Sequence, residues 1–231
     1  AKFTFDQSGG CSPLAVHFTN HSSATSPDAV YTWDFGNGNN SSLTNPGAIY
    51  TNEKTYSITL TVQDAGRTAS QTKEITVYKK PTVDFNTSTI KGCLPLNVSF
   101  TANATAGDGN ISTYTWDFGD GSTQQGYSNM QSHTYTVPQT ESASLTVTNN
   151  YGCHTTLQKR DLLTVIPSLT AAFSADKKVL CLASDPVQFT NTSNGPGTLS
   201  YLWDFGDGNS SAQANPNYAF NKKGIYSVKL T

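Results

Sequence analysis

Pairs of aspartates spaced three residues apart are the side chains in this 231-residue sequence best suited to hold a metal ion. Asp117 and Asp120 form one pair, and Asp204 and Asp207 form another. Carboxylate oxygens presented by loops are the ligands that Ca²⁺ prefers. Both pairs belong to Asp-Phe-Gly-Asp-Gly, however, and Asp-Gly sequences form tight turns in which glycine takes a positive φ. We therefore expect turns with no resident cofactor, and keep calcium as the minor alternative.

Histidine and nucleophile patterns of known enzymes do not occur in the sequence. The four histidines, His17, His21, His133 and His154, lack the spacing of a zinc site. There is no Gly-x-Ser-x-Gly, no phosphate-binding glycine loop and no Cys-His pair with the arrangement of a catalytic centre. We therefore expect a protein that is not an enzyme.

Composition excludes two classes of partner. Charged residues make up 13% of the chain and the formal net charge is −2. Because no run of basic residues is present, little could neutralise a phosphate backbone, and nucleic-acid binding is not expected. No apolar stretch approaches the roughly 18 residues of a membrane span, so none is expected in this segment.

A repeated motif positions the aspartates. The stretch Tyr-x-Trp-Asp-Phe-Gly-Asp/Asn-Gly occurs three times at nearly even intervals, with Asn37 in place of the second aspartate in the first copy. Asparagine suits a turn but removes a ligand charge, which favours the turn interpretation. The shared residues are Trp33, Asp34, Phe35, Gly36, Trp116, Asp117, Phe118, Gly119, Trp203, Asp204, Phe205 and Gly206.

Alternating apolar residues predict that each copy is an all-β sandwich. In the first copy Tyr56, Ile58, Leu60 and Val62 share one face of a strand, because side chains alternate with period two. Short strands of this kind, separated by Gly, Asn, Pro and Asp, are typical of sandwiches. We expect three copies, at residues 1–79, 80–166 and 167–231, with the third lacking its last strand.

The joints between copies are short and contain proline at Pro81 and Pro167. Such linkers are stiff, so the sandwiches are expected to form an extended rod.

The motif and the Cys-x-Pro-Leu entry to the first two copies resemble the PKD (polycystic kidney disease) domain, in the cysteine-bearing subtype of bacterial surface proteins. The resemblance covers essentially the whole chain. It implies immunoglobulin-like sandwiches in an extracellular protein, secreted or at the cell surface. The implied function is a spacer or adhesion array, next to other domains of the same polypeptide, with an unknown protein or glycan ligand. The alternatives are an accessory, substrate-engaging region of a secreted hydrolase and a subunit of an extracellular filament.

Within this scheme the four cysteines are assigned by copy. Cys11, Cys93 and Cys181 enter the second strand of their copies, and Cys153 follows the long penultimate strand of the second. We expect Cys93 to pair with Cys153 of its own copy. Cys11, whose copy has Arg67 at the matching position, and Cys181 are expected to be unpaired.

A second calcium alternative lies near the start of each copy. Asp6, Asp84 and Asp176 recur there, and carboxylates at a junction with a preceding domain could bind the ion. We keep this as a minor alternative too.

Overall fold

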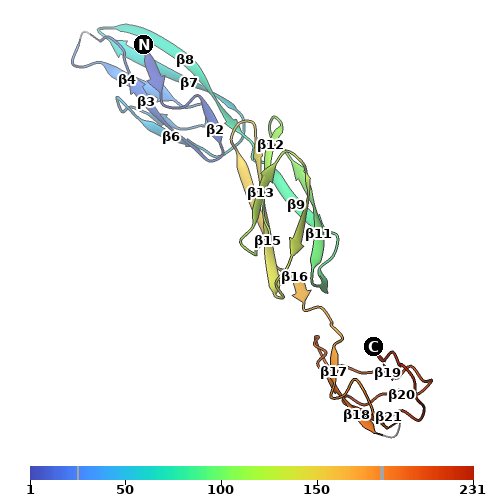
Figure 1. The fold of residues 1–231 in the computed structure, drawn as a ribbon. Helices are drawn as coiled ribbons and strands as arrows, with labels where there is room; N and C mark the ends of the chain where they lie inside the picture. Colours follow the sequence, from blue (N-terminus) through green and yellow to red (C-terminus); the bar gives the residue numbers. More distant parts are fainter. Residues whose placement is uncertain (25, 183–184) are drawn as a thin grey trace. The chain divides into compact units, whose positions relative to one another are not determined.

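The computed structural model describes residues 1–24, 26–182 and 185–231, and every regular element in those ranges is a β-strand (Figure 1). None of the described residues forms a helix long and apolar enough to cross a membrane.

The chain divides into two compact units, which we describe separately. The first unit comprises Ala1–Ser88, Ser99–His133 and Glu141–Leu162. The second comprises Thr89–Val98, Thr134–Thr140 and Leu163–Thr231. The first unit therefore holds the first copy of the motif and most of the second, including the joint between these two copies.

The first copy consists of a three-stranded sheet of order β1-β3-β6 and a five-stranded sheet of order β2-β8-β7-β4-β5. Its strands are β1 (Phe3–Phe5), β2 (Gly9–Cys11), β3 (Leu14–Asn20), β4 (Val30–Asp34), β5 (Asn40–Ser41), β6 (Gly47–Tyr50), β7 (Thr55–Asp64) and β8 (Arg67–Tyr78). On β7 buried and exposed positions alternate, as the apolar pattern predicts. The buried faces of the two sheets form one core.

The second copy repeats both sheets, with the orders β14-β11-β9 and β10-β16-β15-β12-β13. Its strands are β9 (Thr82–Thr87), β10 (Lys91–Cys93), β11 (Leu96–Thr105), β12 (Ile111–Asp117), β13 (Thr123–Gly126), β14 (Met130–Tyr135), β15 (Thr140–Asn149) and β16 (His154–Ile166).

The third copy has two three-stranded sheets, β17-β18-β21 and β20-β19-β22. Its strands are β17 (Phe173–Ala175), β18 (Pro186–Asn191), β19 (Trp203–Asp204), β20 (Ser210–Ser211), β21 (Asn217–Ala219) and β22 (Lys229–Leu230). In the described part of this copy no strand corresponds to β8 or β16, as the sequence predicts.

The motif tryptophan is the centre of each core. All three tryptophans are at most 1% exposed. Each lies opposite a leucine of the neighbouring strand, in the pairs Trp33–Leu60, Trp116–Leu145 and Trp203–Leu230. In the first copy the rings of Phe3 and Phe18 lie 5.1 and 5.5 Å from Trp33. Burial of such large apolar side chains is worth about 1.5–3 kcal/mol each and accounts for the use of aromatics at these positions.

The short strands β2 and β10 cross to the last strand of their copies. β2 runs parallel to the end of β8, with Cys11 opposite Tyr78. β10 runs parallel to the end of β16, with Cys93 opposite Ile166. Each of these cysteines therefore lies level with the last strand residue of its copy.

Candidate functional site

The motif aspartates form turns. Asp34, Asp117 and Asp204 each accept a hydrogen bond from the backbone N–H of the glycine two residues later, at 2.8, 3.0 and 2.9 Å. The residues three positions further on do the same: Asn37 accepts from Asn39 N–H, Asp120 from Ser122 N–H and Asp207 from Asn209 N–H, all at 3.0 Å. The glycines of the motif have positive φ. This is the geometry expected of an Asx turn.

The second acidic position varies together with a residue on the strand beside it. In the second copy the His133 ring lies 2.6 Å from the Asp120 carboxylate and stacks on Phe118. In the third copy Tyr218 takes the place of His133 and donates its hydroxyl to Asp207 at 2.6 Å. In the first copy the equivalent residue, Ala48, has no donor. An aspartate therefore occurs in the two copies in which the strand supplies a side-chain partner.

These partners shift the titration of the carboxylates. Partial burial by itself would raise the pKa of Asp120, but the hydrogen bonds from His133 and Ser122 outweigh it and leave the pKa below its ordinary value. The Tyr218 hydroxyl lowers the pKa of Asp207, and this hydrogen bond raises the pKa of Tyr218.

The aspartates near the start of the first and third copies accept hydrogen bonds from the backbone of their own sandwich. Asp6 accepts the backbone N–H of His17 at 3.0 Å, and Asp176 accepts that of Gln188 at 2.8 Å. Ser88 has this role in the second copy, where it accepts from Ser99 N–H at 3.0 Å.

Asp84 lies elsewhere. It binds Lys159 at 2.8 Å, so the three aspartates do not share a position. Across residues 1–24, 26–182 and 185–231 no group of three or more His, Cys, Asp or Glu side chains is arranged to hold a metal ion.

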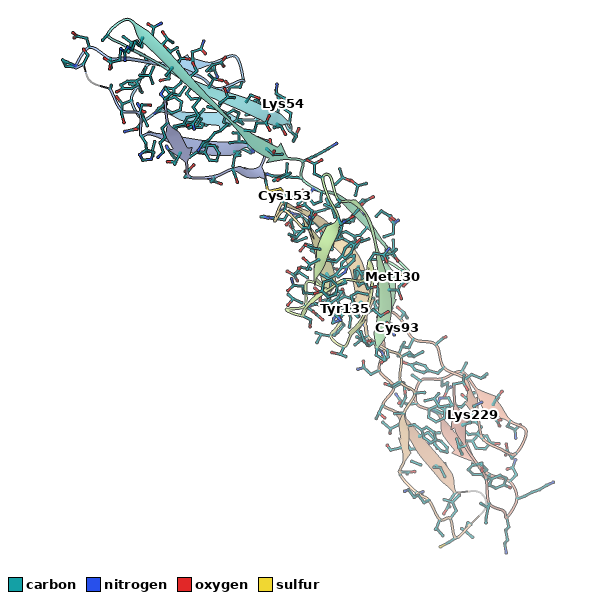
Figure 2. All side chains as sticks on the ribbon, turned by 90° about the horizontal axis from the view of Figure 1, so that it is seen from above. Lys54, Cys93, Met130, Tyr135, Cys153 and Lys229 are labelled. Atoms are coloured by element: carbon teal, nitrogen blue, oxygen red, sulfur yellow. A yellow bond between two sulfur atoms is a disulfide. The ribbon has the colours of Figure 1, made fainter. Side chains whose placement is uncertain are left out.

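The disulfide joins two copies. Cys11 of the first copy is bonded to Cys153 of the second, with their Cα atoms 5.4 Å apart (Figure 2). Cys93 and Cys181 are free and exposed. The predicted bond between Cys93 and Cys153 and the predicted free thiol at Cys11 are therefore wrong.

The length of β16 explains why Cys153 does not bond to Cys93. Cys153 directly precedes the first residue of β16, whereas Cys93 pairs with its last residue, Ile166. A strand of 13 residues, rising about 3.3 Å per residue, separates these ends by about 40 Å. No disulfide can span that distance. The thiol level with the end of the first copy is Cys11, and it meets the turn that begins β16.

Asn149 holds this turn against the linker between the copies. Its side chain is 1% exposed, and its amide donates to the carbonyls of Lys79, Ala106 and Asp108 at 3.1–3.3 Å. Its carbonyl oxygen accepts from the N–H groups of Tyr151 and Cys153, both at 3.0 Å. One buried amide thus ties the linker, the β11–β12 loop and the cysteine-bearing turn together.

The β11–β12 loop binds the linker through its backbone. Lys79 N–H donates to the Asp108 carboxylate at 2.7 Å, and Asp108 N–H donates to the Lys79 carbonyl at 3.3 Å. Gly107 has φ of +72°, and a side chain there would collide with the carbonyl of Lys80. The loop can approach the linker this closely only with glycine at that position.

Two further contacts complete the junction, which we define as residues 78–81, 106–110 and 149–155 together with Cys11. The rings of Tyr78 and Tyr151 stack with their centroids 3.8 Å apart and a 7° angle between planes. Thr155 donates its hydroxyl to the Pro81 carbonyl at 2.7 Å. These covalent, polar and aromatic contacts fix the end of the first sandwich to the start of the second.

Sequence reasoning missed Asn149 and Tyr151 as junction residues. One signal was available for the disulfide. Cys11 stands in a copy whose own turn carries Arg67, while the following copy carries Cys153. A cysteine without a counterpart in its own copy, followed by a copy with one, indicates bonding between neighbours.

Comparison with protein-family models matches the PKD domain at residues 3–77, 78–165 and 171–231. Collagenase ColA of Bacillus cereus is 33% identical over 78 residues, which are 32% of this chain and 7% of that protein. Pre-pro-metalloprotease PrtV of Vibrio cholerae is 46% identical over 44 residues, 19% of this chain and 5% of that protein. The similarity therefore covers only a small part of each of these two proteins.

A solved structure of the PKD1 domain of Vibrio anguillarum Epp is 28% identical to this chain with a TM-score of 0.33. The match covers 38% of this chain and 98% of that one.

Proposed function

Since the chain belongs to the PKD domain family through three tandem segments, we propose that it is a non-catalytic spacer and adhesion array of an extracellular protein. The observation that carries the proposal is the junction between the first two copies. A disulfide, a buried amide and a stacked tyrosine pair hold the first two sandwiches together, as a stiff spacer requires. An extracellular location is favoured because disulfides persist in oxidising compartments.

The spacer proposal predicts that the junction is stiff. Labels for distance measurement by electron spin resonance can be placed at Leu43 and Tyr127, which are 65% and 87% exposed in the first and second copies. Attachment through non-canonical amino acids leaves the cysteines untouched. We expect a narrow distance distribution in the oxidised protein that broadens in Cys11→Ser. A broad distribution in the oxidised protein would contradict a stiff spacer.

A second candidate function is favoured by the relatives. Two proteins with similar segments are named a collagenase and a metalloprotease, so the array could engage the insoluble substrate of a hydrolase of which it is an accessory region. Co-sedimentation of the purified chain with insoluble collagen fibrils, with cellulose particles as the control, tests this. Saturable binding to collagen alone would favour the accessory function. Equal sedimentation with both would argue against it.

A further inference from the structure

Cys93 occupies the same place in the second copy that the bonded Cys11 occupies in the first. Each is the last residue of a three-residue strand that runs parallel to the end of its copy's final strand. Cys11 lies opposite Tyr78 and Cys93 lies opposite Ile166, so Tyr78 and Ile166 are equivalent. Cys93 differs in that its thiol is exposed and free.

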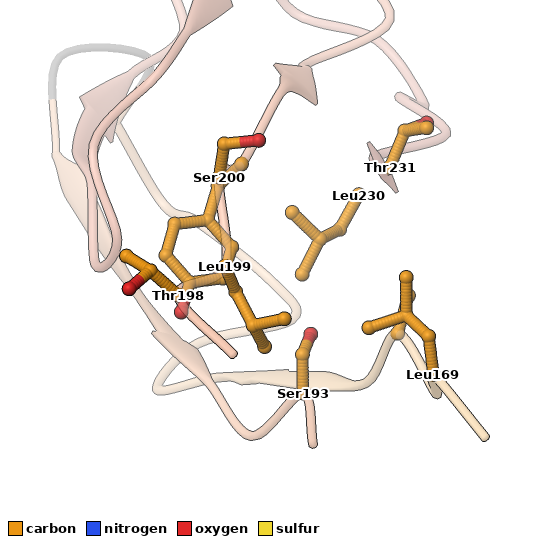
Figure 3. Close-up of a pocket in the computed structure, with 9 residues that line it drawn as sticks. Leu169, Ser193, Thr198, Leu199, Ser200, Leu230 and Thr231 are labelled. Atoms are coloured by element: carbon orange, nitrogen blue, oxygen red, sulfur yellow. The ribbon is translucent and has the colours of Figure 1, made fainter. Parts of the chain in front are cut away.

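A hollow lies at the start of the third copy, at a position equivalent to part of the junction between the first two copies. In the second copy Pro81 is buried, and Thr155 donates to its carbonyl just after the β15–β16 turn. The equivalent residue of the third copy, Leu169, is 65% exposed. Together with Leu230 and Thr231 it lines a hollow of about 220 Å³ (Figure 3). The position that is buried beside Thr155 in the second copy is therefore exposed in the third.

The register shows where a turn over this hollow would begin. Gly119 packs against the backbone of Ser142, and Gly206, its equivalent, packs against that of Ser227. Ser142 and Ser227 are therefore equivalent, which makes Thr231 the counterpart of Thr146. Cys153 lies 7 residues after Thr146.

We propose that Cys93 is the attachment point for the turn of the copy that follows it. When the third copy carries a β15–β16-type turn with cysteine at the position equivalent to Cys153, Cys93 bonds to that cysteine as Cys11 bonds to Cys153. The rule is that the strand-end cysteine of one copy pairs with the turn cysteine of the next. Cys181 has the corresponding position in the third copy and would serve a fourth.

The bond forms by oxidation of two thiols. Both lose their protons, and the two electrons pass to the disulfide of an oxidant, either an oxidoreductase or glutathione disulfide, which is reduced to two thiols as the new S–S bond forms. With glutathione disulfide the products are one protein disulfide and two molecules of glutathione.

The first experiment completes the third copy. Residues Val147–Ile166 are appended after Thr231, so that the turn and last strand of the second copy follow the equivalent residue of the third. The protein is oxidised with glutathione disulfide, alkylated and digested without reduction, and its peptides are identified by mass spectrometry. We expect Cys93 to be protected from alkylation and linked by a disulfide to the graft cysteine. Cys11 should still be linked to Cys153. The matched control carries serine in place of the graft cysteine and should leave Cys93 alkylated.

The second experiment does not depend on whether the graft folds. Residues 167–231 are replaced by a second run of residues 79–166, so that Ile166 precedes Lys79 just as Tyr78 does in the native chain. The copy that follows Cys93 is then one that already forms a junction. We expect Cys93 to bond to the cysteine of the duplicated turn.

Three outcomes would overturn the proposal. Cys93 could stay alkylated in both proteins, the graft cysteine could bond to Cys181 of its own copy, or Cys93 could bond to Cys93 of a second molecule, which gel filtration would show as a dimer. None of these outcomes would bear on whether the native junction is stiff, so failure of this proposal is separable from failure of the proposed function.

Discussion

Cys11 and Cys93 stand at the same position of two sandwiches with the same topology, yet one is bonded and the other is free. Their own copies do not account for the difference, because both lie beside the end of the last strand. The difference lies in the next copy. The second copy offers a turn with a cysteine, and no turn of this kind is present among the described residues of the third copy. The disulfide thus belongs to the junction between two copies and not to a single sandwich.

The β7–β8 turn of the first copy and the β15–β16 turn of the second copy differ in length. The β7–β8 turn of the first copy is tight, with Asp64 paired to Arg67 and positive φ at Ala65 and Gly66. The β15–β16 turn is one residue longer, closed by a hydrogen bond from Asn149 N–H to the Cys153 carbonyl at 2.9 Å. A three-residue loop with glycine in the left-handed region is a common hairpin form. Here it presents Tyr151 and Cys153 to the preceding copy.

The largest expected effect comes from removing the disulfide. Cys153→Ser removes a disulfide whose cysteines are 142 residues apart in the sequence. On the chain-entropy model this loss lowers the free energy of unfolding by at most about 5 kcal/mol. Cys93→Ser, the matched control, should change it by less than about 0.5 kcal/mol because its thiol is exposed and free. Hydrogen exchange of β15 and β16 measures both. Equal losses in the two variants would contradict the difference between the two sites.

Removing the buried amide should have the next largest effect. Asn149→Ala removes the side chain that binds the carbonyls of Ala106 and Asp108 and two N–H groups of the turn, at a cost of about 3 kcal/mol. Asn86→Ala, at an exposed position, is the control. Chemical denaturation under oxidising conditions gives the comparison. If Asn149→Ala were as stable as the control, the amide would not hold the junction.

The tyrosine stack should contribute less. Tyr151→Ala removes a ring stacked on Tyr78, and such a pair is worth about 1 kcal/mol. Tyr127→Ala, which removes an equally large ring that is 87% exposed, is the control. Thermal unfolding of the reduced proteins isolates the stack from the disulfide. A loss of stability no greater than that of Tyr127→Ala would show that the stack does not stabilise the junction.

The smallest effect should distinguish the carboxylates of the copies by pH. The folded pKa of Asp120 is depressed, so its contribution is present above the ordinary aspartate pKa of 3.8 and disappears as pH falls through the lower, folded value. Compared with Asp120→Asn, the native protein should lose about 0.5 kcal/mol more stability below pH 4. Asn37 gives the first copy no such dependence. Denaturation curves from pH 5 to pH 2 test this, and parallel curves for native and variant proteins would contradict it.

Much of the fold could be predicted from the sequence because it depends on local patterns. Alternation identified the strands, the repeated Trp33, Trp116 and Trp203 identified the cores, and Asp-Gly identified the turns. The disulfide could not be predicted by the same reasoning, because assigning Cys153 to its own copy assumes that two cysteines of one sandwich are neighbours. The parallel pairing of β2 with the end of β8 is a non-local contact, and it alone places Cys11 at the far end of its sandwich.

The disulfide of this chain joins two copies rather than two positions of one copy. Digestion of the oxidised, alkylated chain without reduction, followed by mass spectrometry, tests it most directly. The structure predicts one linked peptide pair, containing Cys11 and Cys153, with Cys93 and Cys181 alkylated. A linked pair containing Cys93 and Cys153, with Cys11 alkylated, would contradict it.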